Sequence, residues 1–303
     1  MTQVKASGSI LGATITDIDL ARALSAGDFA LILRALGEHG VLRFPNQRLE
    51  SAQLRDFSAR FGDIQQSVTG KFADPGVPEV GILSNIIENG EPIGLADAGQ
   101  DWHTDMSYNR TIGFTNVLYA VEVPVRDGKT LGNTVFANMH AAYEGLDPAL
   151  KARLEGMTAT HDFNKFWDLM RTRADSSRPP LTPEQRAKRP PAVHPIFLTH
   201  PLTGRKVLYC NPGYAIRINE LSEAESERVL AELFRHQLQD KYLYTHTWTV
   251  NDVLMWDNIG TLHNAIPDYA PHEHRLMKRC QVMATRVFDP AFVRGALGGA
   301  AAH

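Results

Sequence analysis

The segments VGILS (residues 80–84) and VLYAV (residues 117–121) decide the fold class of this chain. Both are short, contain β-branched or aromatic residues, and are separated by clusters of Gly, Pro, Asn and Asp, a pattern typical of strands in an antiparallel sheet. Strand-like composition returns at residues 242–250, 253–256 and 277–288. We therefore predict a mixed α/β chain with a β-sandwich or jelly-roll core.

Helices are predicted to cover this core. Apolar residues recur at helical spacing after Ser25, where the pattern ends near Gly40, and again after Ser51. Ser222 and Glu225 have the spacing of a capping box at the start of a later helix. The expected helices cover residues 25–40, 51–61, 139–155 and 222–239.

Composition excludes several classes of protein. The 303 residues are 43% hydrophobic and 21% charged with a net charge of −3, which excludes a disordered chain and argues against nucleic-acid binding through a basic surface. No apolar run approaches the roughly 20 residues of a membrane-spanning helix, and the N-terminus lacks the apolar stretch of a secretory signal. The two cysteines, Cys210 and Cys280, cannot form a disulfide framework, which favours a reduced, cytoplasmic protein.

The chain is expected to form a single domain over residues 1–303, because no repeat, low-complexity tract or Ser/Gly linker divides it. A polar, proline-rich stretch indicates a long mobile insert near residues 165–192. The loop at 88–100 has the length of an active-site lid. The Gly- and Ala-rich end at 294–303 indicates a flexible tail.

A metal site is indicated by His103 and Asp105. Residues two apart in a strand point to the same face, so this imidazole and carboxylate can bind one ion. His263 is the best candidate for a third ligand, because two histidines and one carboxylate on one face of an octahedron form the non-haem Fe(II) site. With 12 histidines in the chain, a His-x-Asp pair arises by chance about 0.75 times. A strand histidine hydrogen-bonded to a carboxylate is therefore the alternative.

A pair of arginines follows downstream. Arg275 and Arg279 are four residues apart, so on a strand both side chains lie on one face, about 13 Å apart. If that face lines a barrel, the buried guanidiniums require anionic partners, such as a dicarboxylate co-substrate and an acidic substrate. The alternative is that both arginines lie at the surface and form exposed ion pairs.

Together, in this order, the motifs resemble the Fe(II)/2-oxoglutarate-dependent dioxygenases of the taurine dioxygenase and 2,4-dichlorophenoxyacetate dioxygenase (TauD/TfdA) family. The likeness covers nearly the whole chain, and so many elements in order are far more specific than any one of them. The matching elements are residues 12–20, 40–44, 60–63, 102–105, 132–134, 141–144, 161–163, 194–195, 200–201, 211–213, 256–258 with His263, and 275–279.

The resemblance implies a double-stranded β-helix (jelly-roll) core flanked by helices. It also implies that Fe(II) is the cofactor, and that 2-oxoglutarate and O2 are co-substrates that yield succinate and CO2 as a substrate is hydroxylated. The implied iron ligands are His103, Asp105 and His263. Thr134 and Arg275 match the residues that bind the distal carboxylate of 2-oxoglutarate. Arg279 matches a second arginine, which lies near the other end of 2-oxoglutarate and near the acidic group of the substrate.

The substrate implied by the resemblance is a small anionic organic molecule, such as a carboxylate, sulfonate or sulfate ester. Taurine itself is disfavoured, because residues 64–67 (IQQS) stand where taurine enzymes have a sulfonate-binding histidine. Stable hydroxylation, as in the tailoring of an amino acid or natural-product acid, and cleavage of a carbon–heteroatom bond both stay open. Aromatic candidates for the pocket wall, with core packing as the alternative, are Tyr108, Phe163, Phe166, Trp167 and Tyr214.

Two other classes of protein are alternatives. A jelly-roll binding protein keeps the fold without turnover, but all three candidate ligands and both arginines are present here. A zinc hydrolase built on residues 272–274 (HEH) lacks an evident third ligand nearby. By analogy with relatives we expect a homo-oligomer, either a dimer or a tetramer, with no nucleic-acid or membrane partner.

Overall fold

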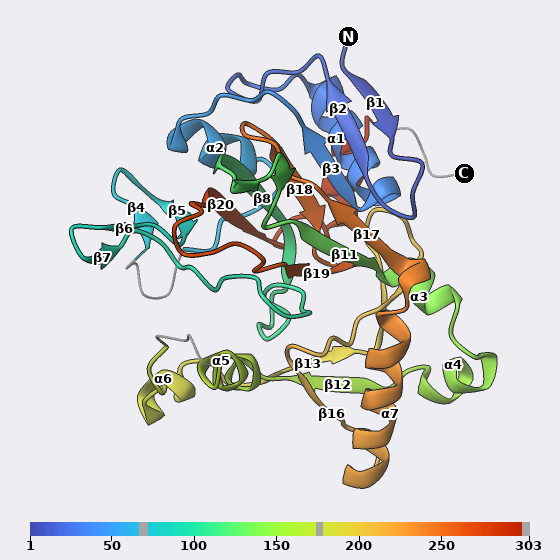
Figure 1. Ribbon diagram of the computed structural model, residues 1–303. Coiled ribbons are helices and arrows are strands. Elements are labelled where there is room, and N and C mark those ends of the chain that lie inside the picture. The colour runs from blue at the N-terminus through green and yellow to red at the C-terminus, as the bar shows by residue number, and fades with distance from the viewer. Residues whose placement is uncertain (67–71, 174–177, 299–303) are drawn as a thin grey trace.

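The computed structural model describes residues 1–66, 72–173 and 178–298 (Figure 1). A large sheet of eight strands organises the fold, and within it β2 and β3 pair in parallel while the other neighbours are antiparallel. The strand order across the sheet is β1 (Gln3–Ala6), β2 (Ala13–Thr16), β3 (Val41–Phe44), β18 (Val253–Asp257), β8 (Gly113–Glu122), β20 (Leu276–Met283), β5 (Val77–Ser84) and β4 (Ala73–Asp74).

Both faces of this sheet are buried at its centre. Successive side chains of a strand point to opposite faces, and β8 follows this rule. Its residues Val117 and Tyr119 belong to the core beneath the helices, while Leu118 and Ala120 belong to a second core on the other face. The apolar run of residues 117–121 therefore reflects a central strand that is covered on both sides.

Two helices cover the first face, and both form where the sequence predicts them. Helix α1 (Ala26–His39) begins after Ser25, whose hydroxyl accepts a backbone N–H hydrogen bond, and ends at Gly40 in the left-handed region with φ of 67°. Helix α2 (Ser51–Ser58) packs beside it against β5, β8 and β20. Their apolar residues join the core of the large sheet.

A three-stranded sheet lies against the second face. It consists of β17 (Leu243–His246), β11 (Thr134–Asn138) and β19 (Thr261–Ala265), and Figure 1 shows it beside β8, β18 and β20. Phe136 of β11 packs in one cluster with Leu118 and Trp256 of the large sheet. The space between these two sheets holds the candidate site.

A further sheet and most of the remaining helices form the lower part of the view in Figure 1. Its strands are β13 (Ala192–Pro195), β12 (Thr158–His161) and β16 (Ala215–Ile218), and α7 (Glu223–Gln237) packs on β16. The helix forms as predicted, but the expected capping box is wrong. The Ser222 hydroxyl donates to the Glu225 carboxylate at 2.9 Å and accepts no backbone N–H.

The single helix expected at residues 139–155 is two helices, α3 (Met139–Glu144) and α4 (Pro148–Leu154). Pro148 explains the break, because proline has no N–H to donate and disfavours helical backbone in the residue before it. Asp147 instead caps α4 by accepting two backbone N–H hydrogen bonds.

Segments predicted to be mobile contain further helices. Helices α5 (Phe163–Arg171) and α6 (Pro183–Ala187) lie in the region of the predicted insert, and α8 (Pro290–Ala296) includes the first residues of the predicted tail, of which 299–303 lie outside the described residues. The mobility of both segments stays a prediction. The remaining short elements are β6 (Ile87–Glu88), β7 (Glu91–Pro92), β9 (Val125–Arg126), β10 (Lys129–Thr130), β14 (Phe197–Thr199), β15 (Lys206–Leu208) and the 3-10 helix η1 (Asp240–Tyr242).

Among the helices of these described ranges, none is both long and apolar enough to cross a membrane.

Candidate metal and co-substrate site

Backbone pairing brings the predicted ligands together. His103 and His263 form an isolated antiparallel bridge, in which each backbone N–H donates to the carbonyl of the other at 3.1 and 2.8 Å. Asp105 lies in the turn that follows, so the regular strand expected through His103 and Asp105 is wrong. The next residue of the turn, Met106, has a φ of 61°, and the Asp105 carboxylate faces both imidazoles.

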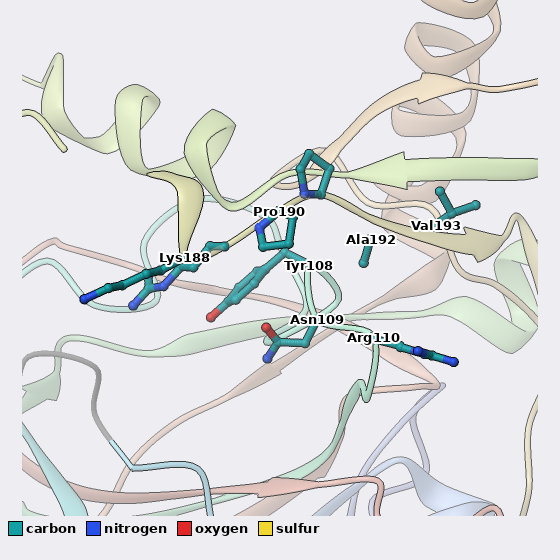
Figure 2. Close-up of a pocket in the computed structure, with 9 residues that line it drawn as sticks. Tyr108, Asn109, Arg110, Lys188, Pro190, Ala192 and Val193 are labelled. Atoms are coloured by element: carbon teal, nitrogen blue, oxygen red, sulfur yellow. The ribbon is translucent and has the colours of Figure 1, made fainter. Parts of the chain in front are cut away.

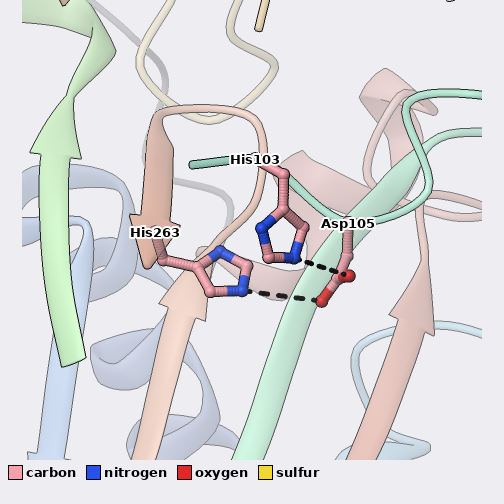
Figure 3. A group of neighbouring side chains, drawn as sticks. All are labelled: His103, Asp105 and His263. Carbon is pink, nitrogen blue, oxygen red and sulfur yellow. Dashed lines mark ion pairs between the residues drawn. The ribbon is translucent and has the colours of Figure 1, made fainter. Parts of the chain in front are cut away.

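The three side chains converge (Figure 3). The His103 Nε2 atom lies 3.5 Å from Asp105 Oδ1, and the His263 Nε2 atom lies 3.9 Å from Asp105 Oδ2. Ligand-type atoms of all three residues lie within 4.8 Å of one another, and the residues are at most 7% exposed. The site therefore offers two imidazole nitrogens and a carboxylate to one buried point.

The protonation states suit a divalent metal. His103 Nδ1 lies 2.8 Å from the Asp101 carbonyl oxygen and donates to it, which leaves the Nε2 lone pair free. Burial lowers the pKa of His263 to about 3, so this imidazole is neutral at pH 7. Burial alone raises the pKa of Asp105, but the neighbouring His103 imidazole and the charge of Arg279 bring it well below its usual range. Neutral imidazoles and an ionised carboxylate are the forms that bind metals.

Asn116 is a site residue that the sequence reasoning missed. It is fully buried on β8, and its Nδ2 atom donates a short hydrogen bond to Asp105 Oδ2. Arg279 Nη1 lies 3.8 Å from the same oxygen. The available signal was the single amide in the otherwise apolar strand FTNVLYAV.

A narrow cavity of about 20 Å³ adjoins the ligands, between the two facing sheets. Thr134, Arg275 and Arg279, all predicted from the sequence, line it together with His263. A volume of this size holds one or two water molecules, so a wall must shift to admit a dicarboxylate. The other lining residues are Leu83, Ala98, Gly99, Leu118, Trp256 and Ala265.

Arg275 is the principal cation of this cavity. It is only 6% exposed, its Nε atom has no hydrogen-bond partner, and its side-chain contact is with Tyr269. No carboxylate within the described part of the chain forms an ion pair with it, and burial lowers its pKa. A buried guanidinium in this state favours an anionic ligand.

Thr134 offers a hydrogen-bond donor to the same cavity. Trp248 Nε1 donates to the Thr134 hydroxyl oxygen at 3.1 Å. Because the oxygen already accepts this bond, the hydroxyl hydrogen is available to a second acceptor. Thr134 and Arg275 can therefore both donate to one carboxylate group.

A cluster of aromatic side chains packs beside the metal ligands. The Phe166 ring lies 4.9 Å from the His103 ring and the Tyr214 ring lies 6.1 Å from it. Tyr108 packs on both Tyr214 and Phe163, at 4.8 and 4.9 Å. Phe166, which the sequence singled out only as one of several aromatic candidates, is thus the ring nearest to His103 among those predicted.

Trp167, the remaining predicted aromatic residue, has different neighbours. Its Nε1 atom donates to the Pro179 carbonyl oxygen, and the Arg178 guanidinium lies 4.8 Å from its ring. It therefore packs within the α5–α6 segment.

A second group of ligand-type residues, His140, His200 and Asp257, lies elsewhere in the described structure. His200 Nδ1 accepts from the backbone N–H groups of residues 202 and 203, and its Nε2 atom lies 2.9 Å from Asp257 Oδ2. Asp257 also accepts from the backbone N–H groups of Ile259 and Gly260, so we interpret this group as support for the turn before β19.

The structure does not assemble the alternative zinc site. His272 and His274 are exposed, and Glu273 pairs with Arg126. The described groups that can hold a metal do not include these three residues. At the position of the taurine enzymes' histidine, Ile64 forms an isolated bridge with Val282 of β20, and Ser67 lies outside the described residues.

Comparison with known proteins decides the family. The family described as "Taurine catabolism dioxygenase TauD, TfdA family" matches residues 3–281. The chain belongs to this family. The resemblance drawn from the sequence is therefore confirmed, as is the expected enzyme class, a 2-oxoglutarate-dependent dioxygenase. Enzymes of the TauD/TfdA family use Fe(II), 2-oxoglutarate and O2.

Relatives within the TauD/TfdA family match over most of their length. Pentalenolactone F synthase from Streptomyces avermitilis is 32% identical over 94% of both chains. The alpha-ketoglutarate-dependent (2-oxoglutarate-dependent) 2,4-dichlorophenoxyacetate dioxygenase of Cupriavidus pinatubonensis is 31% identical over 84% of this chain and 88% of its own. The crystal structure of AAD-2 in complex with Mn(II) and N-oxalylglycine superposes with a TM-score of 0.75 at 26% identity, over 93% of this chain and 97% of AAD-2.

Proposed function

We propose that this TauD/TfdA enzyme binds Fe(II) through His103, Asp105 and His263 and hydroxylates a small anionic organic substrate. The convergence of these three buried side chains beside an unpaired buried arginine is the observation that carries the proposal. When bound, the iron supplies the activation of O2 that is coupled to decarboxylation of 2-oxoglutarate. The chain itself supplies the neutral imidazoles, the ionised carboxylate and an enclosed site.

We propose that Arg275 and Thr134 bind the distal carboxylate of 2-oxoglutarate. Support comes from the unpaired guanidinium of Arg275 and from the free hydroxyl hydrogen of Thr134, which meet in one cavity. Arg279 lies closer to Asp105 and is the candidate for the other end of the co-substrate and for the acidic group of the substrate. The aromatic rings of Tyr108, Phe163 and Tyr214 are proposed as the apolar wall of the substrate pocket.

We propose two possible outcomes of hydroxylation, a product that fragments and a product that is stable. One relative is named for a phenoxyacetic acid and another for a lactone, pentalenolactone. The first favours a small organic acid that fragments at a carbon–heteroatom bond, and the second favours a tailoring hydroxylation. Both are compatible with an apolar wall beside the ligands.

We also propose the core topology, the domain organisation, the location and the oligomeric state of this chain. The large sheet facing a three-stranded sheet supports a double-stranded β-helix core in one domain over residues 1–303. Cys210 and Cys280 are buried and free, which supports a cytoplasmic location. A homo-oligomer, dimer or tetramer, is proposed by analogy alone.

Succinate formation tests the proposed function. The purified chain is incubated with Fe(II), 2-oxoglutarate and O2 and a panel of aryloxy acids, sulfonates, sulfate esters and amino acids. We expect succinate in proportion to a hydroxylated or fragmented product for at least one acid, and less than 1% of that rate for His103→Ala, because the variant lacks one metal ligand.

Equal, negligible succinate from both proteins across the panel would instead support a binding protein without turnover. Anaerobic addition of 2-oxoglutarate to the Fe(II) protein gives an independent measurement. A visible absorption band is expected only if 2-oxoglutarate chelates iron, and a zinc protein would show none.

A further inference from the structure

A second cavity, of about 470 Å³, lies on the outer side of Tyr108. Residues 108–110 form one wall and residues 188–193 form the other, which joins α6 to β13. Figure 2 shows Lys188 and Arg110 extending to opposite sides, with Tyr108 between them. Three of the nine lining residues are cationic and none is acidic, so the cavity has a positive potential.

Arg189 is the cation of this cavity that is best prepared to bind an anion. Its guanidinium stacks over the Phe163 ring at 4.0 Å, and it has no ion pair with any carboxylate of the described chain. Stacking uses the flat face of the guanidinium and leaves the N–H groups at its edge free to donate to a carboxylate. Arg189 is half-buried, whereas Lys188 and Arg110 are exposed and more strongly screened.

The backbone around Arg189 is restrained. Pro190 and Pro191 follow it directly, and a residue before proline is restricted to extended conformations. On its other side, the Arg189 N–H donates to the carbonyl oxygen of Arg186 in α6. Less conformational entropy is therefore lost when a ligand binds.

A series of ring contacts connects the lining of this cavity to the metal ligands. Phe163, beneath Arg189, packs on Tyr108, and Tyr108 packs on Tyr214 next to His103. The pKa of Tyr108 rises to about 12, chiefly through burial, and it responds both to Asp105 and to Arg189.

We propose that Arg189 binds the anionic group of an organic acid whose apolar body lies along the Tyr108, Phe163 and Tyr214 rings and whose oxidised carbon is at the opposite end, beside the metal ligands. This inference rests on the proposed function and specifies its substrate class. For the acidic group of the substrate this inference places Arg189 ahead of Arg279, because Asp105 lies 3.8 Å from Arg279 and already offsets its charge, and it leaves Arg279 as the candidate for the other end of the co-substrate.

Binding of a matched pair of probes tests the proposal. Naphthalene-1-acetate and naphthalene-1-acetamide have nearly the same shape and differ in charge. The full chain is loaded with Mn(II) and N-oxalylglycine, so that the co-substrate cavity is filled, and each probe is titrated by calorimetry. The wild type should bind the acid at least tenfold more tightly than the amide, and Arg189→Gln should remove this preference while the amide affinity changes less than twofold.

Arg171→Gln is the matched control. It removes one charge from the same α5–α6 segment, where Arg171 faces Asp168 and lines neither cavity. This variant should keep the wild-type preference, and Arg189→Lys should keep part of it. A wild type that does not prefer or does not bind the acid, an Arg189→Gln variant that still prefers it, or equal weakening of both probes would each overturn the proposal.

The test measures no turnover, so its failure is separable from failure of the proposed function. A chain that forms succinate but shows no Arg189-dependent preference would contradict the proposed subsite alone. A chain that passes the binding test but forms no succinate would contradict the proposed function alone.

Discussion

Asp105 has polar contacts on both of its carboxylate oxygens. Oδ1 faces His103, while Oδ2 accepts from Asn116 and lies near Arg279 and His263. Contacts of this kind orient a metal-binding side chain in the metal-free protein, and their removal typically lowers metal affinity by about 10- to 100-fold. Asn116 is therefore the positioning residue that the structure adds to the predicted ligands.

Substitution of Asn116 by Leu should weaken Mn(II) binding by about 10- to 100-fold, because one oxygen of Asp105 loses its buried donor. Calorimetric titration of the metal-free protein measures the effect. Asn219→Leu is the matched control, since its amide contacts Thr158 and Thr160 far from the ligands in the chain. Equal metal affinities in the wild type and Asn116→Leu would contradict a positioning role, provided that both variants keep the wild-type circular dichroism.

At the scale of elements, ion pairs join the loop before the ligands to the α5–α6 segment. Arg178 pairs with Asp97 through both carboxylate oxygens at 2.7 and 2.9 Å, and Arg173 pairs with Asp101 at 2.8 Å. Ala98 and Gly99 of the same loop line the narrow cavity. This loop is thus a wall that can shift to admit 2-oxoglutarate, and the ion pairs oppose that shift.

Asp97→Asn should make local opening of the loop at residues 93–101 more frequent. The ion pair is largely buried, with side chains 11% and 23% exposed, so its loss should lower the local opening free energy by about 1 kcal/mol. Amide hydrogen exchange of residues 93–101 should then be about fivefold faster, while residues 113–122 of the central strand β8 exchange at the wild-type rate. Unchanged exchange in residues 93–101 would exclude a restraining role for the pair.

The sequence predicted most elements but not their local details. The helix at residues 26–39 was predictable from its apolar spacing and its capping residues, Ser25 and Gly40. Both signals arise between residues that are close together in the sequence. The capping box of Ser222 failed because its hydroxyl has two competing partners, the backbone N–H and the Glu225 carboxylate. The bridge of His103 to a distant strand was not predictable from spacing, because strand pairing between distant segments depends on the whole fold.

At the scale of the molecule, buried neutral histidines make the free energy of unfolding depend on pH. Burial lowers the pKa of His161 and of His246 to about 3, whereas an unfolded histidine titrates near 6.5. Between these values the unfolded chain binds protons that the native chain excludes, so stability falls as the pH decreases below about 6.5. Above that pH these two groups do not affect the slope.

His161→Phe should reduce the dependence of the free energy of unfolding on pH. The substitution removes one titrating group and keeps a ring against Tyr209, whose ring centroid lies 6.0 Å away. Urea unfolding at pH 8, 7, 6 and 5 should show a loss of stability between pH 6 and 5 that is smaller than in the wild type by about 1 kcal/mol. The two curves should run parallel between pH 7 and 8, and parallel curves down to pH 5 would contradict the assignment.

The sequence by itself determined the residue types of the site and the alternation of strands and helices, because ligand chemistry and hydrophobic periodicity are local properties. It also determined the family, since many motifs occur in a shared order along the chain. Only the tertiary structure decided that Asn116 contacts Asp105, that Arg275 lacks a carboxylate partner, and that Arg189 stacks on Phe163. The two contacts join residues 11 and 26 positions apart in the chain, and such contacts depend on how the sheets and helices pack against one another.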